Sequence, residues 1–93
     1  GGLPAASHWL QTGERIDYPA ADAIVREKYA IPAPETTAPL LDVTIGGALC
    51  YVVARYAEDG TLLARYAVSR TEGVIHRWDT DLNAWEIDRR FNV

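Results

Sequence analysis

Short turn signals divide the second half of the chain into segments of strand length. Gly46-Gly47 suits a two-residue turn in which both residues adopt a left-handed backbone. The triplets at 58–60 (Glu-Asp-Gly) and 71–73 (Thr-Glu-Gly) both fit three-residue loops that end on a left-handed glycine, and residues 79–84 fit a longer turn. Because tight turns join neighbouring antiparallel strands, residues 40–90 are predicted to form a five-stranded antiparallel β-meander.

The preceding segment carries the marks of one helix. Asp17 is a suitable N-cap and Pro19 suits the first helical turn. Apolar residues recur at helical spacing along one stripe, formed by Ala21, Ile24, Val25 and Tyr29. Residues 31–39 hold three prolines, which lack amide donors and favour extended backbone, so this segment is expected to be a Pro-rich connector. The helix is therefore predicted over residues 18–30.

These elements predict a single α+β domain. The chain has 93 residues, of which 48% are hydrophobic and 24% charged, as is typical of a globular protein with one core. The domain is expected to span residues 18–93, with the helix packed on one face of the sheet, and residues 1–17 are expected to form an N-terminal arm. The chain starts with Gly1-Gly2 and contains no methionine, which suggests a processed product, a tag remnant or an excised domain.

The net charge and the cysteine content limit the classes of partner and the cellular compartment that we expect for this chain. The formal net charge is −4, and duplex nucleic acid binds mainly to clustered cations, so it is an unlikely match for this chain. Cys50 is the only cysteine, which excludes an intrachain disulfide and favours a cytoplasmic protein. Apolar runs are only a few residues long, so no membrane-spanning helix is expected.

The turn chemistry also predicts a register for the strands. Val43 is expected opposite Cys50, Tyr56 opposite Leu62, Val52 opposite Tyr66, Val68 opposite His76, and Trp78 opposite Trp85. Since side chains alternate between the two faces of a sheet, this register collects the apolar residues on one face, which the helix should cover. Sliding the hairpin at 58–60 by one residue would place Arg65 opposite Ala54 and distribute arginines over both faces, so that register is disfavoured.

The opposite, outer face then mixes apolar and basic side chains. It carries Tyr51, Val53, Arg55, Leu63, Arg65, Ile75 and Arg77. Tyrosine and arginine are enriched in protein interfaces, and large apolar patches rarely stay bare, so these seven residues are predicted to bind another protein or a second copy of the chain. Two other interpretations are that the arm covers this face through Trp9 and Leu10, or that arginine stems lie over the aliphatic residues in solvent.

Catalytic chemistry finds little support. In the predicted register His76 and Cys50 are buried on one face but two strands apart, beyond the reach that a nucleophilic Cys–His pair needs. Acidic pairs fall in turns, and one cysteine with two distant histidines is poor material for a zinc site. The sequence therefore predicts a non-enzymatic protein-interaction module of the inhibitor, immunity, adaptor or accessory type, without catalytic residues, cofactor or metal.

Two alternative functions remain open at this level. A pocket between helix and sheet, near His76 and lined also by Tyr56, Tyr66 and Trp78, would suit a small-molecule binder or an enzyme. Single-stranded nucleic acid could stack on Tyr51 beside the arginines of the outer face, although the net acidity opposes this.

Overall fold

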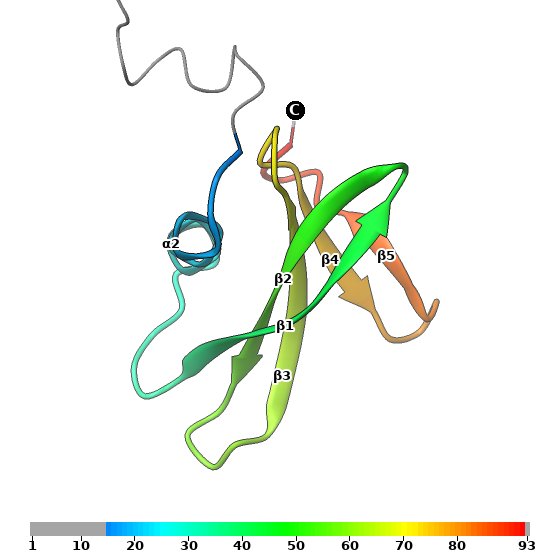
Figure 1. Ribbon diagram of the computed structural model, residues 1–93. Helices are drawn as coiled ribbons and strands as arrows, with labels where there is room; N and C mark the ends of the chain where they lie inside the picture. Colours follow the sequence, from blue (N-terminus) through cyan, green and yellow to red (C-terminus); the bar gives the residue numbers. More distant parts are fainter. Residues whose placement is uncertain (1–14, 93) are drawn as a thin grey trace, which may run out of the picture.

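The protein is one helix packed on an antiparallel sheet. The computed structural model describes residues 15–92. Helix α2 is followed by five strands in meander order, β1-β2-β3-β4-β5, and lies on one side of the sheet (Figure 1). The elements are α2 (Tyr18–Lys28), β1 (Thr36–Ile45), β2 (Ala48–Tyr56), β3 (Leu62–Ser69), β4 (Ile75–Asp79) and β5 (Ala84–Ile87). The α+β class and the five-stranded meander predicted from the sequence are confirmed.

The start of α2 follows the sequence signals closely. The Asp17 carboxylate accepts a hydrogen bond from the backbone N–H of Ala20 at 2.9 Å, which satisfies one of the free donors at the helix start. Pro19 lies in the first turn. The helix ends at Lys28, two residues before the predicted end, and Ala30 adopts a left-handed backbone with φ 49°.

The apolar stripe of α2 packs on the sheet as predicted. Ala21 and Val25 are fully buried, and Ile24 and Tyr29 pack against the same core. The Tyr29 ring stacks on Tyr66 of β3, with the ring centroids 4.1 Å apart. The sheet side of this core is formed by Val53, Tyr66, Val68 and Ile75.

Strand β1 begins four residues earlier than predicted, because the end of the expected connector pairs with β2. Thr36 lies opposite Tyr56, and Pro39 lies opposite Val53. The Leu49 carbonyl accepts a hydrogen bond from the backbone N–H of Arg70, so the odd-numbered residues of β2 direct their backbone groups toward β3. Pro39 therefore needs no donor toward β2, which explains why the strand tolerates it.

Two turns have the backbone that their residues predict. Gly46 and Gly47 have φ values of 57° and 83°, as a two-residue primed turn requires, and Val43 lies opposite Cys50 as expected. Gly60 closes its loop with φ 91°, and Tyr56 lies opposite Leu62. At these points the predicted register is confirmed.

Beyond the turn at Gly60, the predicted register between β2 and β3 is wrong by one residue. Arg55 pairs with Ala64 and Tyr56 pairs with Leu62, so Leu63 is an extra residue that forms a bulge in β3. Tyr66 consequently lies opposite Val53 instead of Val52. Arg65 lies opposite Ala54, which is the pairing that the sequence disfavoured.

The register between β3 and β4 is also shifted by one. The backbone N–H of Ser69 donates to the carbonyl of Val74 at 2.9 Å, so residues 70–73 form a four-residue loop, not the three-residue loop expected. His76 therefore lies opposite Ala67 instead of Val68. The last hairpin is as predicted, with Trp78 opposite Trp85.

Because of these two shifts, the side chains of β3 lie on the opposite face from the predicted one, relative to the side chains of β2 and β4. Tyr66 and Val68 join Val53 and Ile75 on one face, and α2 covers this apolar surface. The helix therefore packs on the face that the sequence predicted to be outer. The other face is called the open face below; it carries Cys50, Val52, Arg65, Ala67, His76, Trp78, Trp85 and Ile87.

The sheet curls around the open face. In a flat sheet of five strands about 4.8 Å apart, the two edges would lie about 19 Å from each other. Val43 of β1 and Trp85 of β5 nevertheless pack against one buried cluster, formed by Cys50, Val52 and Ala67. Figure 1 shows the end of β1 turned toward β5. The open face is therefore concave, with the two edge strands as its walls.

Candidate functional site

The structure separates the seven residues that the sequence assigned to one partner surface. Val53 is fully buried and Ile75 is 2% exposed, so both are core residues beneath α2. Leu63 is the bulge residue, with 48% exposure, and Arg65 lies on the open face. The helix covers the predicted binding face because the β3 bulge moves Tyr66 onto it.

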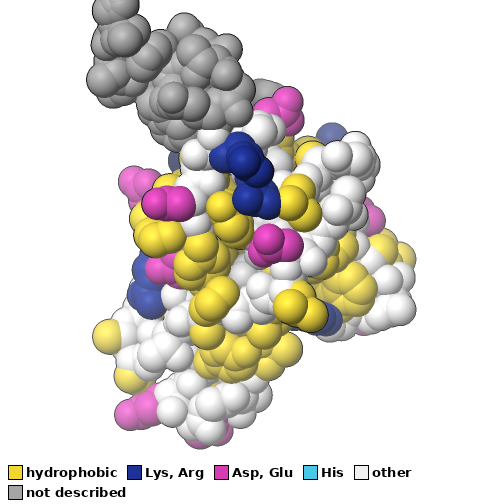
Figure 2. Space-filling view, viewed as in Figure 1, with side chains coloured by type: hydrophobic (Ala, Val, Ile, Leu, Met, Phe, Trp, Pro, Cys, Tyr) yellow, Lys and Arg dark blue, Asp and Glu magenta, His cyan; other side chains and the backbone are white. Residues whose placement is uncertain are grey.

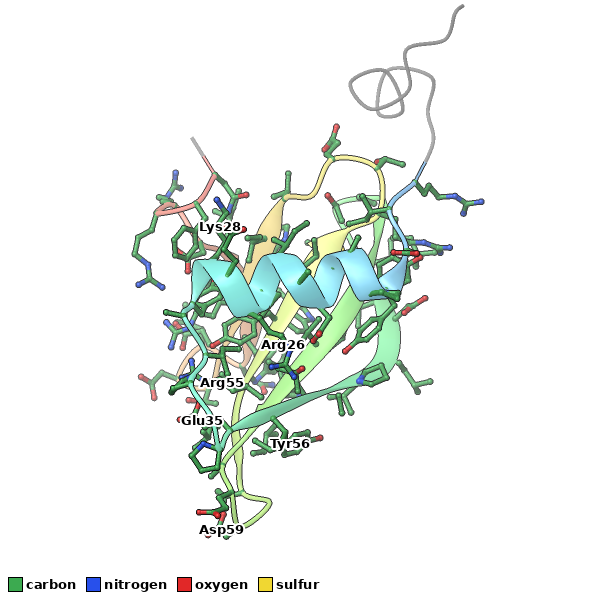
Figure 3. All side chains as sticks on the ribbon, turned by 90° about the vertical axis from the view of Figure 1, so that its left-hand side faces the viewer. Arg26, Lys28, Glu35, Arg55, Tyr56 and Asp59 are labelled. Atoms are coloured by element: carbon green, nitrogen blue, oxygen red, sulfur yellow. The ribbon has the colours of Figure 1, made fainter. Side chains whose placement is uncertain are left out.

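The side chains of Tyr51 and Arg55 connect the sheet to other parts of the chain through hydrogen bonds. The Tyr51 hydroxyl donates to the carbonyl of Ile16 at 3.1 Å. The Arg55 Nε lies 2.6 Å from Glu35 Oε1, and its Nη1 donates to the Tyr66 hydroxyl at 3.3 Å. Figure 3 shows Arg55 and Glu35 close together below α2. These two side chains are engaged in holding the fold.

The Tyr51 ring, the stacking platform suggested by the sequence, has two neighbours from within the chain. The Tyr18 ring is T-shaped to it, with the centroids 6.1 Å apart, and the Arg70 guanidinium lies over it at 5.0 Å. The side of the ring that Arg70 covers is therefore not free for a base. Coverage of a sheet face by Trp9 and Leu10, the other sequence-based interpretation, concerns residues outside the described range 15–92.

The open face holds an apolar groove between the two edge strands. The groove has a volume of about 290 Å³ and is lined by Leu40, Leu41, Val43, Val52, Arg65 and Trp85. Leu41 is 89% exposed and Leu40 is 40% exposed, so both have apolar surface that a partner could cover. Figure 2 shows hydrophobic side chains gathered over the β1 region of the molecule and toward β5.

Three side chains, those of Arg65, Trp78 and Trp85, contact one another in that order beside this groove. Trp78 and Trp85 face each other across β4 and β5 in edge-to-face contact, with centroids 5.2 Å apart and the ring planes at 76°. The Arg65 guanidinium lies over the Trp78 ring, 4.6 Å from its centroid. Aromatic and cation–π contacts of this kind fix the orientation of the arginine.

Arg65 has no carboxylate partner in the described part of the chain, and Arg15, Arg70, Arg77 and Arg89 form no ion pair there either. Arg26, Arg55 and Arg90 each form an ion pair with a carboxylate, at 2.6–3.0 Å. Within residues 15–92, Arg65 forms no ion pair or side-chain hydrogen bond that meets the usual distance limits. It is also the only charged residue among the six that line the groove.

Two reactive side chains share the open face but do not meet. Cys50 is fully buried, its thiol contacts the Ala48 carbonyl at 3.5 Å, and burial raises the pKa of the thiol. Burial lowers the pKa of His76, whose Nδ1 has no hydrogen-bond partner in the described part of the chain. The two residues lie on β2 and β4, with β3 between them, so they are not arranged as a nucleophilic pair.

A second, polar cleft lies at the C-terminal end of α2. It has a volume of about 730 Å³, and its walls include Lys28, Tyr66, Arg77 and Trp78, but neither His76 nor Tyr56. The pocket that the sequence placed around His76 is therefore not assembled. Tyr66 lies under the helix, whereas His76 projects to the open face.

One wall of the polar cleft is held by a buried carboxylate. Asp88 accepts hydrogen bonds from Arg90 Nη2 at 2.8 Å and from the Tyr29 hydroxyl at 2.6 Å. The bonds from Arg90, then that from Tyr29, hold the pKa of Asp88 far below its usual range, although burial acts in the opposite direction. Burial and the Asp88 carboxylate raise the pKa of Tyr29. This network ties the C-terminal turn to the helix.

Two acidic residues in turns accept backbone hydrogen bonds, which is the structural role that the sequence predicts. Asp79 accepts from the backbone N–H groups of Asp81 and Leu82, and Asp59 accepts from that of Thr61. Over residues 15–92, no three His, Cys, Asp or Glu side chains are grouped so as to hold a metal ion. The same part of the chain contains no helix long and apolar enough to cross a membrane.

Of the six residues that line the groove, only Arg65 belongs to the surface predicted from the sequence; the prediction missed Leu40, Leu41, Val43, Val52 and Trp85. The pairing of Trp85 with Trp78 was predicted, but without a role in binding. The signal that could have found the groove is an aromatic pair near two consecutive leucines, Leu40 and Leu41, on the opposite edge strand. Comparison with protein-family models, with curated proteins and with solved structures gives no match for this chain.

Proposed function

We propose that this protein is a small non-enzymatic module that binds another protein, or a second copy of itself, through the open face of its sheet. The observation that carries the proposal is the exposed apolar groove beside a tryptophan pair and an arginine. An inhibitor, immunity protein, adaptor or accessory domain would act in this way. The single cysteine suits a reducing compartment, and we propose the cytoplasm.

The composition of the groove supports protein binding over simple solvent exposure. Tryptophan and arginine are the residues most enriched at positions that dominate binding energy. Full burial of one leucine side chain stabilises a complex by about 1.5–3 kcal/mol, and both Leu40 and Leu41 have area left to bury. A partner that covered these two residues and Trp85 would therefore gain enough free energy to offset part of the cost of association.

The substitution Leu41→Glu tests the proposal. Leu41 is 89% exposed, so a polar side chain at this position leaves the fold intact but places a charge in the binding surface. We expect the wild-type chain either to form dimers in sedimentation experiments over a range of concentrations or to retain a specific protein from a host extract. Leu41→Glu should remove that association.

Arg26→Gln is the matched control, because Arg26 is exposed on α2, away from the open face. The control should behave as the wild type in both measurements. The proposal fails if the wild type and Leu41→Glu have the same mass at every concentration and retain the same proteins.

The polar cleft favours a second candidate function, the binding of a small polar ligand. Its walls combine the cations Lys28, Arg77 and Arg89 with the acids Asp79 and Glu86, and its volume is in the usual range of ligand pockets. A ligand-dependent increase in melting temperature that Arg77→Ala abolishes would support this function. No such increase across a panel of small anions and amino acids would remove it.

A further inference from the structure

Building on the function proposed above, we infer that the groove binds an acidic peptide segment. In this mode a bulky apolar side chain of the partner enters the groove, and the carboxylate of an adjacent Asp or Glu pairs with Arg65.

The groove has room for one or two side chains. Its volume of about 290 Å³ lies at the lower limit of pockets for small molecules. Its walls are apolar on the β1 side, at Leu40, Leu41 and Val43, and aromatic on the β5 side, at Trp85. A site of this size and lining fits an aliphatic or aromatic side chain of a peptide.

Arg65 is oriented to bind a carboxylate at the rim of this groove. Its planar guanidinium lies with the carbon 4.6 Å from the centre of the Trp78 ring. The contact with Trp78 leaves the guanidinium N–H donors without a side-chain partner in residues 15–92, so they remain for the two oxygens of a carboxylate. Since Trp85 in turn holds Trp78, the donors are positioned before the partner arrives.

Charge complementarity selects an acidic partner over a neutral or basic one. The chain as a whole carries a net charge of −4, but the only charged residue that lines the groove is Arg65. A neutral segment that covered the groove would take Arg65 out of water without a counter-charge, which is costly. A basic segment would add repulsion. A carboxylate beside the apolar side chain removes both penalties.

The edge of β1 opposes a partner that would bind as an additional strand. Pro39 directs its nitrogen toward the free edge and offers no donor there, and the pairing with β2 shifts between Leu40 and Val43. These two features interrupt the backbone ladder that an added strand would need. The partner is thus recognised through side chains on the open face.

The test is a selection of random peptides displayed on phage, with the immobilised wild-type chain as the target. We expect enriched peptides to contain a bulky apolar residue beside Asp or Glu. One such peptide is synthesised with both ends blocked, together with a copy in which the acid is replaced by its amide, and calorimetry measures both affinities. The wild type should bind the acidic peptide about tenfold to a hundredfold more tightly than the amide copy, the range expected of charged hydrogen bonds.

Variants then show whether Arg65 causes the preference for the acidic peptide over its amide copy. Arg65→Gln should bind the acidic and amide peptides with equal affinity, while Arg26→Gln should keep the wild-type preference. Leu41→Glu, which leaves the fold intact, should lose both peptides. Circular dichroism and thermal unfolding establish that each variant is folded before its affinity is compared.

Four results would overturn the inference. They are enrichment of peptides without Asp or Glu, an Arg65→Gln variant that keeps the acidic preference, loss of all binding when the peptide ends are blocked, and a wild-type dimer that Leu41→Glu dissociates. In the last case the occupant is a second copy, and the proposed function stands without the acidic peptide. If no peptide binds and Leu41→Glu changes nothing, the proposed function itself fails.

Discussion

At the scale of single residues, the Asp88 carboxylate is the most deeply buried charged group among the described residues. The side chain of Asp88 is 6% exposed and is held by Arg90 and the Tyr29 hydroxyl. A carboxyl whose pKa is lower in the folded state stabilises the fold while it is ionised. This stabilisation is complete above the unfolded pKa of about 3.9 and decreases as the pH falls below it.

Asp88→Asn should therefore lower the free energy of unfolding at neutral pH and make it depend less on pH under acidic conditions. We expect a loss of about 1–3 kcal/mol in the free energy of unfolding at pH 7, because the negative charge is lost from a carboxylate that accepts four hydrogen bonds, three from Arg90 and one from the Tyr29 hydroxyl. The difference from the wild type should shrink as the pH falls below about 3.9. Urea unfolding at pH 7 and at pH 3 measures both quantities. Asp81→Asn, in an exposed turn, should unfold as the wild type does at each pH.

At the scale of elements, one extra residue in β3 decides what the helix covers. Leu63 has no opposite residue in β2, and from that bulge onward the side chains of β3 exchange faces. Tyr66 and Val68 then lie beside Val53, and α2 packs on the combined surface. The helix itself is specified locally, by its Asp17 cap and its apolar stripe, whichever face it meets.

Val53→Ala and Leu63→Ala distinguish this arrangement from the register predicted by the sequence, in which both residues lie on the outer face. Val53 is fully buried, so its truncation should cost about 2 kcal/mol in the free energy of unfolding. Leu63 is 48% exposed, and its truncation should cost less than about 1 kcal/mol. Chemical denaturation of the two variants measures the contrast, and equal losses would contradict the register.

At the scale of the whole molecule, the sheet carries one apolar cluster on each face, and the two clusters are covered to different extents. The cluster beneath α2 is closed by a helix, whereas among residues 15–92 the open-face cluster of Cys50, Val52 and Ala67 is covered by side chains of the edge strands alone. Trp85 is the side chain through which β5 reaches that cluster. The edge strands are thus the part of the sheet where stability is expected to be lowest.

Trp85→Ala should loosen the curl without unfolding the protein. We expect faster hydrogen exchange in β5, where the contact of Trp85 with Trp78 and the open-face cluster is lost. Exchange in β2 and β3 should change little, since these central strands keep their ladders and the helix-side core. Hydrogen-exchange mass spectrometry resolves the segments. Uniformly faster exchange through all five strands would contradict a local role for Trp85.

The sequence by itself determined the elements and their order. The Asp17 cap, Pro19, the paired glycines at 46–47 and the Trp78–Trp85 pairing all act over a few residues, so their consequences are readable from neighbouring positions. One α+β domain with a five-stranded meander follows from them. The membership of each face does not, because side chains alternate with a period of two residues.

Only the tertiary structure decided which face the helix covers, and therefore where a partner could bind. With a period of two, a single bulge at Leu63 or one more residue in the loop at 70–73 moves every later side chain of a strand to the other face relative to its neighbour. Turn chemistry alone fits both outcomes. Packing decides between them: Tyr66 and Val68 are buried together with Val53 under α2, which removes their apolar surface from water. Arg65 was left on the open face as a consequence.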